Sequence, residues 1–268
     1  MNNTSTSQKT IHDFKTGDKI TQFFVIRKIE MKAKRDGTPY IFLEVGDHSG
    51  RISSNLWNEA KNMYDHFNEG DAVKIEGSII EYNKKLQISV DKIRKAEPSD
   101  NIIIKDFVPR EKIDHHLLKQ KFQTAVQSVS NPFLKKLLHT LFRDSLLERF
   151  FETPGGKLWH HAYIGGLLEH TLAVADICDT MAKLYPMADR DLLITGALLH
   201  DIGKMDEYGF DKGFIDYTDE GRLWGHISIG AQLVRTVVED IEKGESFPIE
   251  LKPALLPCWL PPQTQVKF

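Results

Sequence analysis

Three histidines and one aspartate have the type and spacing expected of ligands for a divalent metal ion. His170 lies in GGLLEHTLAVAD, His200 and Asp201 lie in LLHDIGK, and His226 lies in LWGHISIG. Each histidine is set in a mostly apolar stretch with helical spacing. Neutral imidazole and carboxylate both donate lone pairs to divalent ions. A bound ion lowers the pKa of a water and neutralises charge on a phosphoryl oxygen, so the pattern predicts a hydrolytic metal site.

Each of these histidines also has an ordinary explanation when it is taken alone. A single histidine on an apolar face is most often a hydrogen-bonded core residue. The joint context favours a metal, because HDIGK has one histidine about 30 residues before it and another about 25 after it. Taken alone, Lys204 also has an ordinary explanation as a solvated surface lysine. We interpret Asp206 and Glu207 as residues that only solvate the loop after the motif.

The elements that must carry these residues are predicted to be helices from residue 113 onward. The spacing of apolar residues indicates helices at 113–128, 132–151, 160–184, 189–200 and 224–243. Asn131-Pro132 is a helix-start signal, and Pro186 ends the third helix. His170 then lies on the third helix, and His200 ends the fourth helix. His160 and His161 open the third helix, and we expect them in an exposed first turn, with an approach to the site as the alternative.

The first half of the chain has the alternation of β-strands instead. Five strands are predicted at 19–34, 40–47, 51–57, 71–82 and 86–94, with a short helix at 58–67. This order resembles the OB-fold, a small Greek-key barrel. The predicted fold class is therefore an N-terminal all-β OB-fold barrel followed by an all-α domain. The predicted organisation is a flexible arm at 1–14, the barrel at 15–98, a linker at 99–112, the helical domain at 113–252 and a tail at 253–268.

OB barrels bind single strands by stacking bases on aromatic side chains and contacting phosphates with basic ones. Strand alternation places Ile41, Leu43 and Val45 on the core face and leaves Tyr40 and Phe42 on the other face. The candidate binding residues on the outer face and in a neighbouring loop are Phe42, Arg51, Asn55, Trp57, Lys84 and Lys85. An alternative for Trp57 is that it closes the barrel end beneath the short helix.

Composition limits the classes of protein that remain. The chain has 268 residues, is 41% hydrophobic and 27% charged, and carries a net charge of −3, so any surface for nucleic acid must be local. Its two cysteines form no disulfide pattern, and it has neither a secretory signal nor an apolar run long enough for a membrane span. These features predict a cytoplasmic protein, and a homo-oligomer is compatible with them.

The chemistry-bearing motifs resemble the HD-domain superfamily of metal-dependent phosphohydrolases, whose signature is H…HD…D. The OB-like segment followed by HHAYIGGLLEHTL, YPMADRDLLITGALLHDIGK and DYTDEGRLWGHISIG resembles the YhaM-type 3′→5′ exoribonucleases of bacteria over nearly the whole chain. The resemblance implies metal ligation by His170, His200, Asp201 and His226, and catalytic roles for Asp201 and Lys204. It also implies one or two divalent ions, with manganese favoured, and single-stranded RNA as the partner, with single-stranded DNA as the alternative.

The resemblance fails after residue 252. The family pattern continues with a further histidine, a His-His pair and a closing aspartate, whereas this chain reads ELKPALLPCWLPPQTQVKF and has no aspartate after Asp240. Four prolines, at 253, 257, 261 and 262, argue against a helix there. We therefore expect an incomplete HD domain with an aberrant tail, from a truncated or frame-shifted reading or from a short natural variant.

The sequence thus predicts a metal-dependent 3′→5′ exoribonuclease whose activity is impaired by the missing ligands. Two alternatives remain. One is a non-catalytic protein that binds single-stranded nucleic acid, and the other is an HD phosphohydrolase of free nucleotides.

Overall fold

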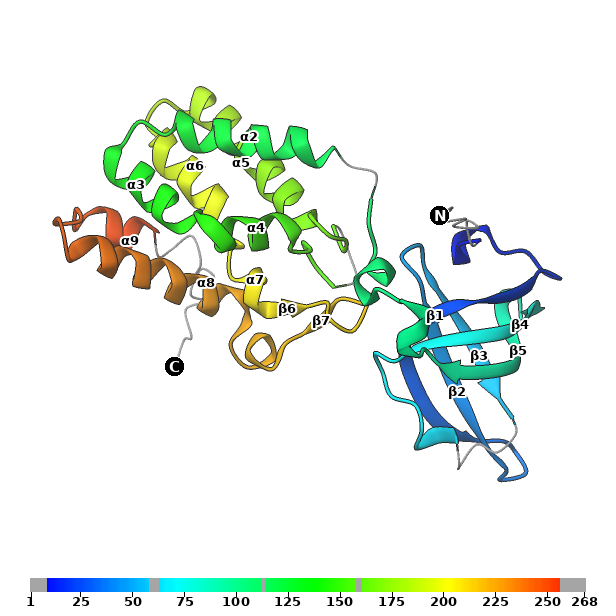
Figure 1. Cartoon of the computed structure of the whole chain (residues 1–268). Helices are drawn as coiled ribbons and strands as arrows, with labels where there is room; N and C mark the ends of the chain where they lie inside the picture. The colour runs from blue at the N-terminus through cyan, green and yellow to red at the C-terminus, as the bar shows by residue number, and fades with distance from the viewer. Residues whose placement is uncertain (1–8, 58–62, 112–113, 158–160, 256–268) are drawn as a thin grey trace, which may run out of the picture. The chain divides into compact units, whose positions relative to one another are not determined.

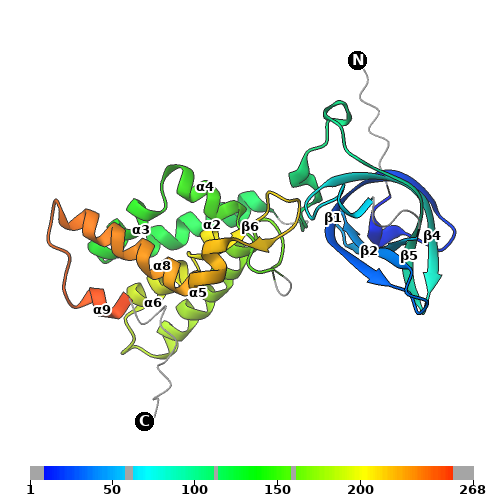
Figure 2. The same ribbon diagram turned by 90° about the horizontal axis from the view of Figure 1, so that it is seen from below.

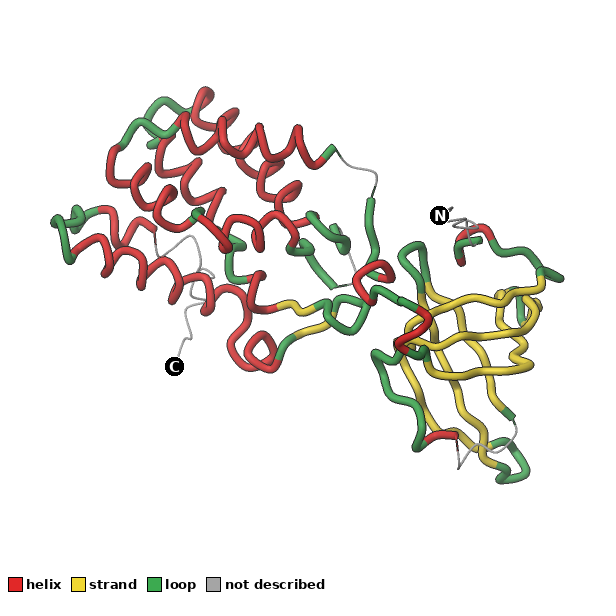
Figure 3. The backbone as a smooth tube through the Cα atoms, in the orientation of Figure 1, coloured by secondary structure: helices red, strands yellow, loops and turns green. Residues whose placement is uncertain are grey.

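The computed structural model describes residues 9–57, 63–111, 114–157 and 161–255, and the chain divides into two compact units. Unit 1 comprises residues 1–110 together with 210–214, and unit 2 comprises residues 111–209 and 215–268. Unit 1 holds the long strands and unit 2 holds the long helices (Figures 1 and 3). The predicted fold class, an all-β barrel followed by a helical domain, is confirmed.

Five strands of unit 1 close into a barrel in the order β1-β2-β3-β5-β4. They are β1 (Lys19–Ala33), β2 (Pro39–Gly46), β3 (Arg51–Leu56), β4 (Ala72–Tyr82) and β5 (Lys85–Lys95). The long β1 pairs with β4 through its first half and with β2 through its second half. A short parallel contact between β3 and β5 closes the barrel, and Figure 2 shows the strands curving around it.

The barrel core follows the predicted alternation of side chains. Ile41, Leu43 and Val45 of β2 are fully buried, whereas Phe42 between them is only half-buried. Val73 and Ile75 of β4 face the same core and are also fully buried. Because β-branched side chains pack well on a pleated surface, this face is apolar and the opposite face remains available for polar and aromatic groups.

Unit 2 packs its helices around a core of leucine and phenylalanine side chains. Its elements are α2 (His115–Ser128), α3 (Pro132–Leu141), α4 (Asp144–Glu152), α5 (Gly166–Leu184), α6 (Arg190–Leu199), α7 (Lys204–Glu207), β6 (Tyr208–Gly209), β7 (Asp216–Tyr217), α8 (Asp219–Glu242) and α9 (Leu251–Leu255). Helix α5 packs against α2, α4 and α6, and α7 packs against α8. Among the described residues, none of the helices has the length and apolarity that crossing a membrane requires. Three short 3-10 helices, η1 (Ile11–Asp13), η2 (Pro98–Asp100) and η3 (Ile104–Phe107), lie in unit 1.

Three predicted helix boundaries are wrong. The helix predicted at 224–243 begins at Asp219, and it is interrupted at Gly225. The segment 132–151 forms two helices, α3 and α4, which are separated at Phe142 and Arg143. The third predicted helix begins at Gly166 rather than at 160, because His161 and Gly165 have φ angles of +61° and +84°. A left-handed backbone cannot continue a right-handed helix. His161 is therefore not on an exposed first turn.

Two other predictions fall largely outside the described residues. The short helix predicted at 58–67 includes residues 58–62, and the tail predicted at 253–268 includes residues 256–268, and both of these segments lie outside the described part. Residues 253–255 belong to α9, whose Leu255 is buried in the helical core. Pro253 is in the first turn of α9, where a helix tolerates the missing N–H.

Candidate metal centre

Three predicted ligand atoms of unit 2 form a nearly equilateral triangle. Nε2 of His170 lies 3.2 Å from Nε2 of His200, and Oδ2 of Asp201 lies 3.4 Å from the first nitrogen and 3.3 Å from the second. His170 is carried by the first half of α5, whereas His200 caps the end of α6 and Asp201 follows it. Helices that are distant in the sequence therefore bring three donors together as one group.

The triangle has the dimensions of a metal-binding face. Ligand atoms at about 2.0–2.1 Å from one ion in tetrahedral or octahedral geometry are separated by roughly 3.0–3.4 Å. Two imidazole nitrogens with one carboxylate oxygen suit first-row divalent ions such as Zn²⁺, Fe²⁺ and Mn²⁺. Asp201 is only 7% exposed, so its charge needs a cationic partner. The residues present therefore fit a divalent metal ion.

A backbone carbonyl sets the orientation of the His200 ring. Nδ1 of His200 lies 2.8 Å from the carbonyl oxygen of Ala197. Because a carbonyl oxygen only accepts, Nδ1 donates its hydrogen there and the neutral ring keeps its lone pair on Nε2. That lone pair is directed at the triangle. Burial would lower the pKa of His200, but the hydrogen bond and charge of Asp201 outweigh burial and raise the pKa above its ordinary value.

Lys204 is held against Asp201 and is not a solvated surface lysine. Its Nζ lies 2.7 Å from Oδ2 of Asp201 and donates a second hydrogen bond of 2.7 Å to the carbonyl of Gly155, while its side chain is only 13% exposed. Burial would raise the pKa of the Asp201 carboxyl, but hydrogen bonds from His170, His200 and Lys204 hold that pKa well below its ordinary range.

His226 approaches the same carboxylate from the opposite oxygen. Its Nε2 lies 3.5 Å from Oδ1 of Asp201, whereas His170, His200 and Lys204 all face Oδ2. His226 is carried by α8 just after Gly225, where the backbone leaves the helical conformation. The four predicted ligands therefore lie together, and Asp201 stands between one pair of histidines and the third histidine.

The sequence analysis missed the burial of Glu207 and the hydrogen bonds of His161 beside this group. Glu207 is 5% exposed and hydrogen-bonded to His226, so the prediction that it only solvates a loop is wrong. Nδ1 of His161 lies 2.9 Å from the Tyr163 hydroxyl and 3.2 Å from Glu169, and the rings of His161 and His170 are 5.6 Å apart. Burial and the Glu169 carboxylate raise the pKa of Tyr163. Neither arrangement has a periodic signal, because each depends on a residue with a positive φ angle: Gly225 within α8 for Glu207, and His161 before α5 for the other.

The outer face of β2 and β3 in unit 1 carries the predicted aromatic groups. Trp57 is 51% exposed, and its ring stacks at 4.8 Å on Tyr40. The ammonium groups of Lys34 and Lys32 lie 4.7 Å from the Trp57 ring and 4.0 Å from the Phe42 ring. We call Tyr40, Phe42, Asn55 and Trp57 the platform, since Phe42 and Asn55 are paired across the two strands.

The other predicted binding residues lie farther along these elements. Arg51 opens β3 on the same face as Asn55 by strand alternation, and it pairs with Glu44 at 3.4 Å. Lys84 and Lys85 are at the turn between β4 and β5 rather than on β2 or β3. The positive φ angles of Asn83 and Lys84 are typical of a tight hairpin turn.

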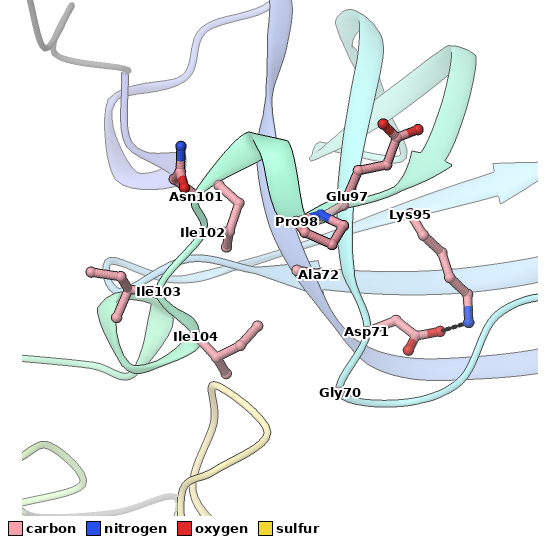
Figure 4. A pocket seen from close by; sticks show the side chains of 11 residues that line it. Gly70, Asp71, Ala72, Lys95, Glu97, Pro98, Asn101, Ile102, Ile103 and Ile104 are labelled. Atoms are coloured by element: carbon pink, nitrogen blue, oxygen red, sulfur yellow. Dashed lines mark ion pairs between the residues drawn. The ribbon is translucent and has the colours of Figure 1, made fainter.

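A separate open pocket in unit 1 offers no comparable chemistry (Figure 4). Its most polar contact is the ion pair between Lys95 and Asp71 at 2.8 Å, and the isoleucines at 102, 103 and 104 form its apolar side. Histidine and cysteine do not occur among the residues that line it. We therefore place the candidate catalytic chemistry in unit 2.

Comparisons with known proteins agree with this division of the chain. The sequence model of the OB-fold nucleic acid binding domain matches residues 25–96, and that of the HD domain matches residues 167–250. Solved structures similar to the barrel include the second OB-fold domain of replication protein A from Methanococcus maripaludis. That domain is 24% identical, with a TM-score of 0.28, and the match covers 34% of this chain and 95% of that domain.

The barrel and the helical site thus define a protein that joins an OB-fold domain to an HD phosphohydrolase domain. The 3′-5′ exoribonuclease YhaM of Halalkalibacterium halodurans is 30% identical over 218 residues, which are 81% of this chain and 67% of that protein. The YhaM of Shouchella clausii is 28% identical over 236 residues, which are 87% of this chain and 73% of that protein. The chain belongs to the family of YhaM 3′-5′ exoribonucleases.

Proposed function

We propose that this chain is a metal-dependent exoribonuclease that degrades single-stranded RNA from its 3′ end with manganese as its cofactor. The observation that carries the proposal is the triangle of donor atoms from His170, His200 and Asp201, with sides of 3.2 to 3.4 Å. A group with these donors in an HD domain supports hydrolysis of a phosphodiester rather than a purely structural role. Membership of the YhaM family supports RNA as the substrate class.

Each residue of the centre has a distinct part in this proposal. His170, His200 and Asp201 would hold the ion, and His226, which faces the opposite oxygen of Asp201, would serve a second ion. A bound divalent ion supplies a water of lowered pKa and neutralises charge on the scissile phosphate. Lys204 uses two of its three N–H groups on Asp201 and Gly155, so its third can meet a phosphate oxygen. The chain releases nucleoside monophosphates.

The platform of unit 1 holds the strand in this proposal. Aromatic rings accept any base by stacking, and the neighbouring Lys32 and Lys34 attract the phosphate backbone. Arg51, Lys84 and Lys85 extend the positive charge along the barrel. This mode of binding favours a single strand over a duplex, because the bases must be unpaired to stack on the platform.

A single assay tests the proposal. The purified chain is incubated with 5′-labelled single-stranded RNA and Mn²⁺, and the expected result is a ladder shortened from the 3′ end and abolished by EDTA. The control is His200→Ala, which removes one donor of the triangle and is checked for its fold by circular dichroism. We expect this variant to form no ladder.

Two outcomes would contradict the proposal, the first from this assay and the second from a parallel reaction with free nucleotides. A gel shift without products would indicate a protein that binds single-stranded nucleic acid without cleaving it. Hydrolysis of free nucleotides with intact oligonucleotides would indicate a nucleotide phosphohydrolase.

A further inference from the structure

Glu207, the last residue of α7, makes two hydrogen bonds to one residue of the candidate centre. Its Oε1 accepts from the backbone N of His226 at 3.0 Å and lies 2.9 Å from Nδ1 of the same histidine. The side chain of Glu207 is only 7% exposed. A buried carboxylate that accepts both a backbone and a ring hydrogen from one residue fixes that residue's position and the orientation of its ring.

The backbone of α8 creates the need for this acceptor. Gly225 has φ +68° and ψ 156°, so the helix is interrupted immediately before His226. The N–H of His226 consequently begins a new helical segment, where it lacks an acceptor from the preceding turn. Glu207 supplies that acceptor from a different helix and thereby acts as a cap for the second segment of α8.

Close contacts between α7 and α8 hold the two residues in register. A Cβ added to Gly221 would lie 2.3 Å from the carbonyl oxygen of Glu207, and one added to Gly203 would lie 2.0 Å from the carbonyl oxygen of His226. Thr218, which caps the start of α8, donates its backbone N–H to the carbonyl of Glu207 at 3.0 Å. Contacts at Gly203, Gly221 and Thr218 therefore fix the position of Glu207 relative to His226.

We propose that Glu207 is a positioning residue that orients His226 for a divalent cation. An ionised carboxylate only accepts, so Nδ1 of His226 carries the hydrogen and the lone pair of the neutral ring is on Nε2. That Nε2 faces Oδ1 of Asp201 at 3.5 Å. The inference deepens the proposed function and rests on its metal centre, since an oriented lone pair beside Asp201 is a ligand only if an ion is bound there.

Metal binding gives the first test, with Mn²⁺ alone as the probe and the full chain as the protein. We expect Glu207→Met, which conserves volume but removes the acceptor, to weaken Mn²⁺ binding roughly 10- to 100-fold. His226→Ala should give a similar loss, and the double variant should lose no more than His226→Ala alone, because Glu207 acts through that ring. Additive losses would overturn the proposal.

The matched controls separate the positioning role from a loss of charge or of stability. Asp206→Asn removes the neighbouring carboxylate, which pairs with Arg149, and it should leave Mn²⁺ affinity unchanged. Glu207→Gln keeps an oxygen that can accept from His226, and it should restore affinity to within about threefold of the wild type. Equal losses in Glu207→Gln and Glu207→Met would contradict positioning through this hydrogen bond.

The tautomer of His226 is a second readout that needs no metal. In the metal-free wild-type chain labelled with ¹⁵N-histidine, NMR should show the His226 hydrogen on Nδ1. A ring protonated only on Nε2 would overturn the inference. This measurement does not need the Glu207→Met variant, so it stands even if that variant fails to fold. The proposed metal centre and the proposed role of Glu207 can be rejected independently. Unchanged Mn²⁺ binding by His200→Ala and His226→Ala would reject the metal centre. The tautomer of His226 would still test the hydrogen bond from its Nδ1 to Glu207.

Discussion

In the proposed function, Lys204 contacts the substrate phosphate and does not hold the metal. Its ammonium group bonds to the carboxylate of Asp201 and to the carbonyl of Gly155, both at 2.7 Å. A fixed cation beside a metal ligand repels a bound metal ion, but it attracts the phosphate that the ion also contacts. We therefore expect binding of the ion and cleavage of the substrate to depend on Lys204 in opposite ways.

This difference gives a prediction for Lys204→Met. We expect Mn²⁺ affinity to be unchanged or a few-fold tighter, because a like charge is removed, while kcat for RNA cleavage falls about 10- to 100-fold. Isothermal titration with Mn²⁺ and single-turnover cleavage measure the two quantities. Lys183→Met, at an exposed position of α5, is the control and should change neither. Loss of Mn²⁺ binding as large as that of His200→Ala would show that Lys204 only supports the site's structure.

At this scale the sequence predicted the donors of the centre but not their supports. His170, His200, Asp201 and His226 stand out because imidazoles and a carboxylate interrupt apolar stretches. Glu207 resembles any acidic residue in a polar segment, and its burial depends on the interruption of α8 at Gly225. The resemblance to a family gave the roles of the donors, whereas the orientation of each ring required the structure.

The contact between α7 and α8 depends on glycine at two facing positions. A Cβ at Gly203 would lie 2.0 Å from the carbonyl oxygen of His226 and 2.5 Å from the backbone N of Gly230. Neither atom belongs to a flexible side chain, so relief requires the two helices to separate. Any such separation moves His226 away from Asp201.

We expect Gly203→Ala to destabilise the chain by about 1–3 kcal/mol and to weaken Mn²⁺ binding. Urea denaturation and metal titration test the two effects. The matched control is Gly244→Ala, where the nearest atom to the added Cβ is the Ile241 carbonyl oxygen at 3.8 Å, and its free energy of unfolding should change by less than about 0.5 kcal/mol. A stable Gly203→Ala chain with normal metal binding would contradict this account of the contact.

Asp216 of the short β6–β7 pair forms ion pairs with two residues elsewhere in unit 2. Its carboxylate lies 2.5 Å from Nζ of Lys157 and 3.1 Å from Nη2 of Arg222. Burial would raise the pKa of Asp216, but the hydrogen bond from Lys157 and that from the Tyr217 backbone outweigh burial and lower the pKa. A depressed folded pKa means that ionisation of Asp216 contributes stability above the unfolded pKa of about 3.9.

The resulting prediction concerns pH. At neutral pH we expect Asp216→Asn to lower the free energy of unfolding by about 1 kcal/mol, and this difference from the wild type should shrink as pH falls below about 4. Urea denaturation of both proteins across that range measures it. A difference that stays constant or grows in acid would contradict the sign derived from the lowered pKa.

The spacing of apolar residues predicted most of the helices and strands. The boundaries that it missed are set by local backbone geometry. The five barrel strands agree with the structure within about two residues, because one face of each is buried and the alternation is clear. The split between α3 and α4 and the late start of α5 were missed, since left-handed residues such as His161 and Asp144 leave no mark on hydrophobic spacing. The β6–β7 pair is too short to have a period at all.

For the whole molecule, a net charge of −3 restricts any surface for nucleic acid to a local patch, which we propose lies on the barrel. We expect Trp57→Leu and Phe42→Leu each to weaken binding of single-stranded RNA roughly 5- to 150-fold, the effect of losing one stacked base. Fluorescence anisotropy with labelled RNA and no metal measures this loss without cleavage. Phe23→Leu is the matched control, because Phe23 lies on β1 and contacts Lys74 and Arg94 of β4 and β5 instead. Equal losses in all three variants would show that binding does not depend on the platform.

The closure of the barrel has a consequence for its motions. Strands β3 and β5 pair only at Ser53 with Gln87 and at Ser54 with Ile88, whereas β4 and β5 pair along nearly their whole length. The β3–β5 ladder is so short that it can open locally while the other strands stay paired. Its backbone amide hydrogens then exchange with deuterium. We therefore expect the barrel to open first beside the strand that carries Asn55. An RNA strand bound across β2 and β3, as proposed, should slow isotope exchange along this seam.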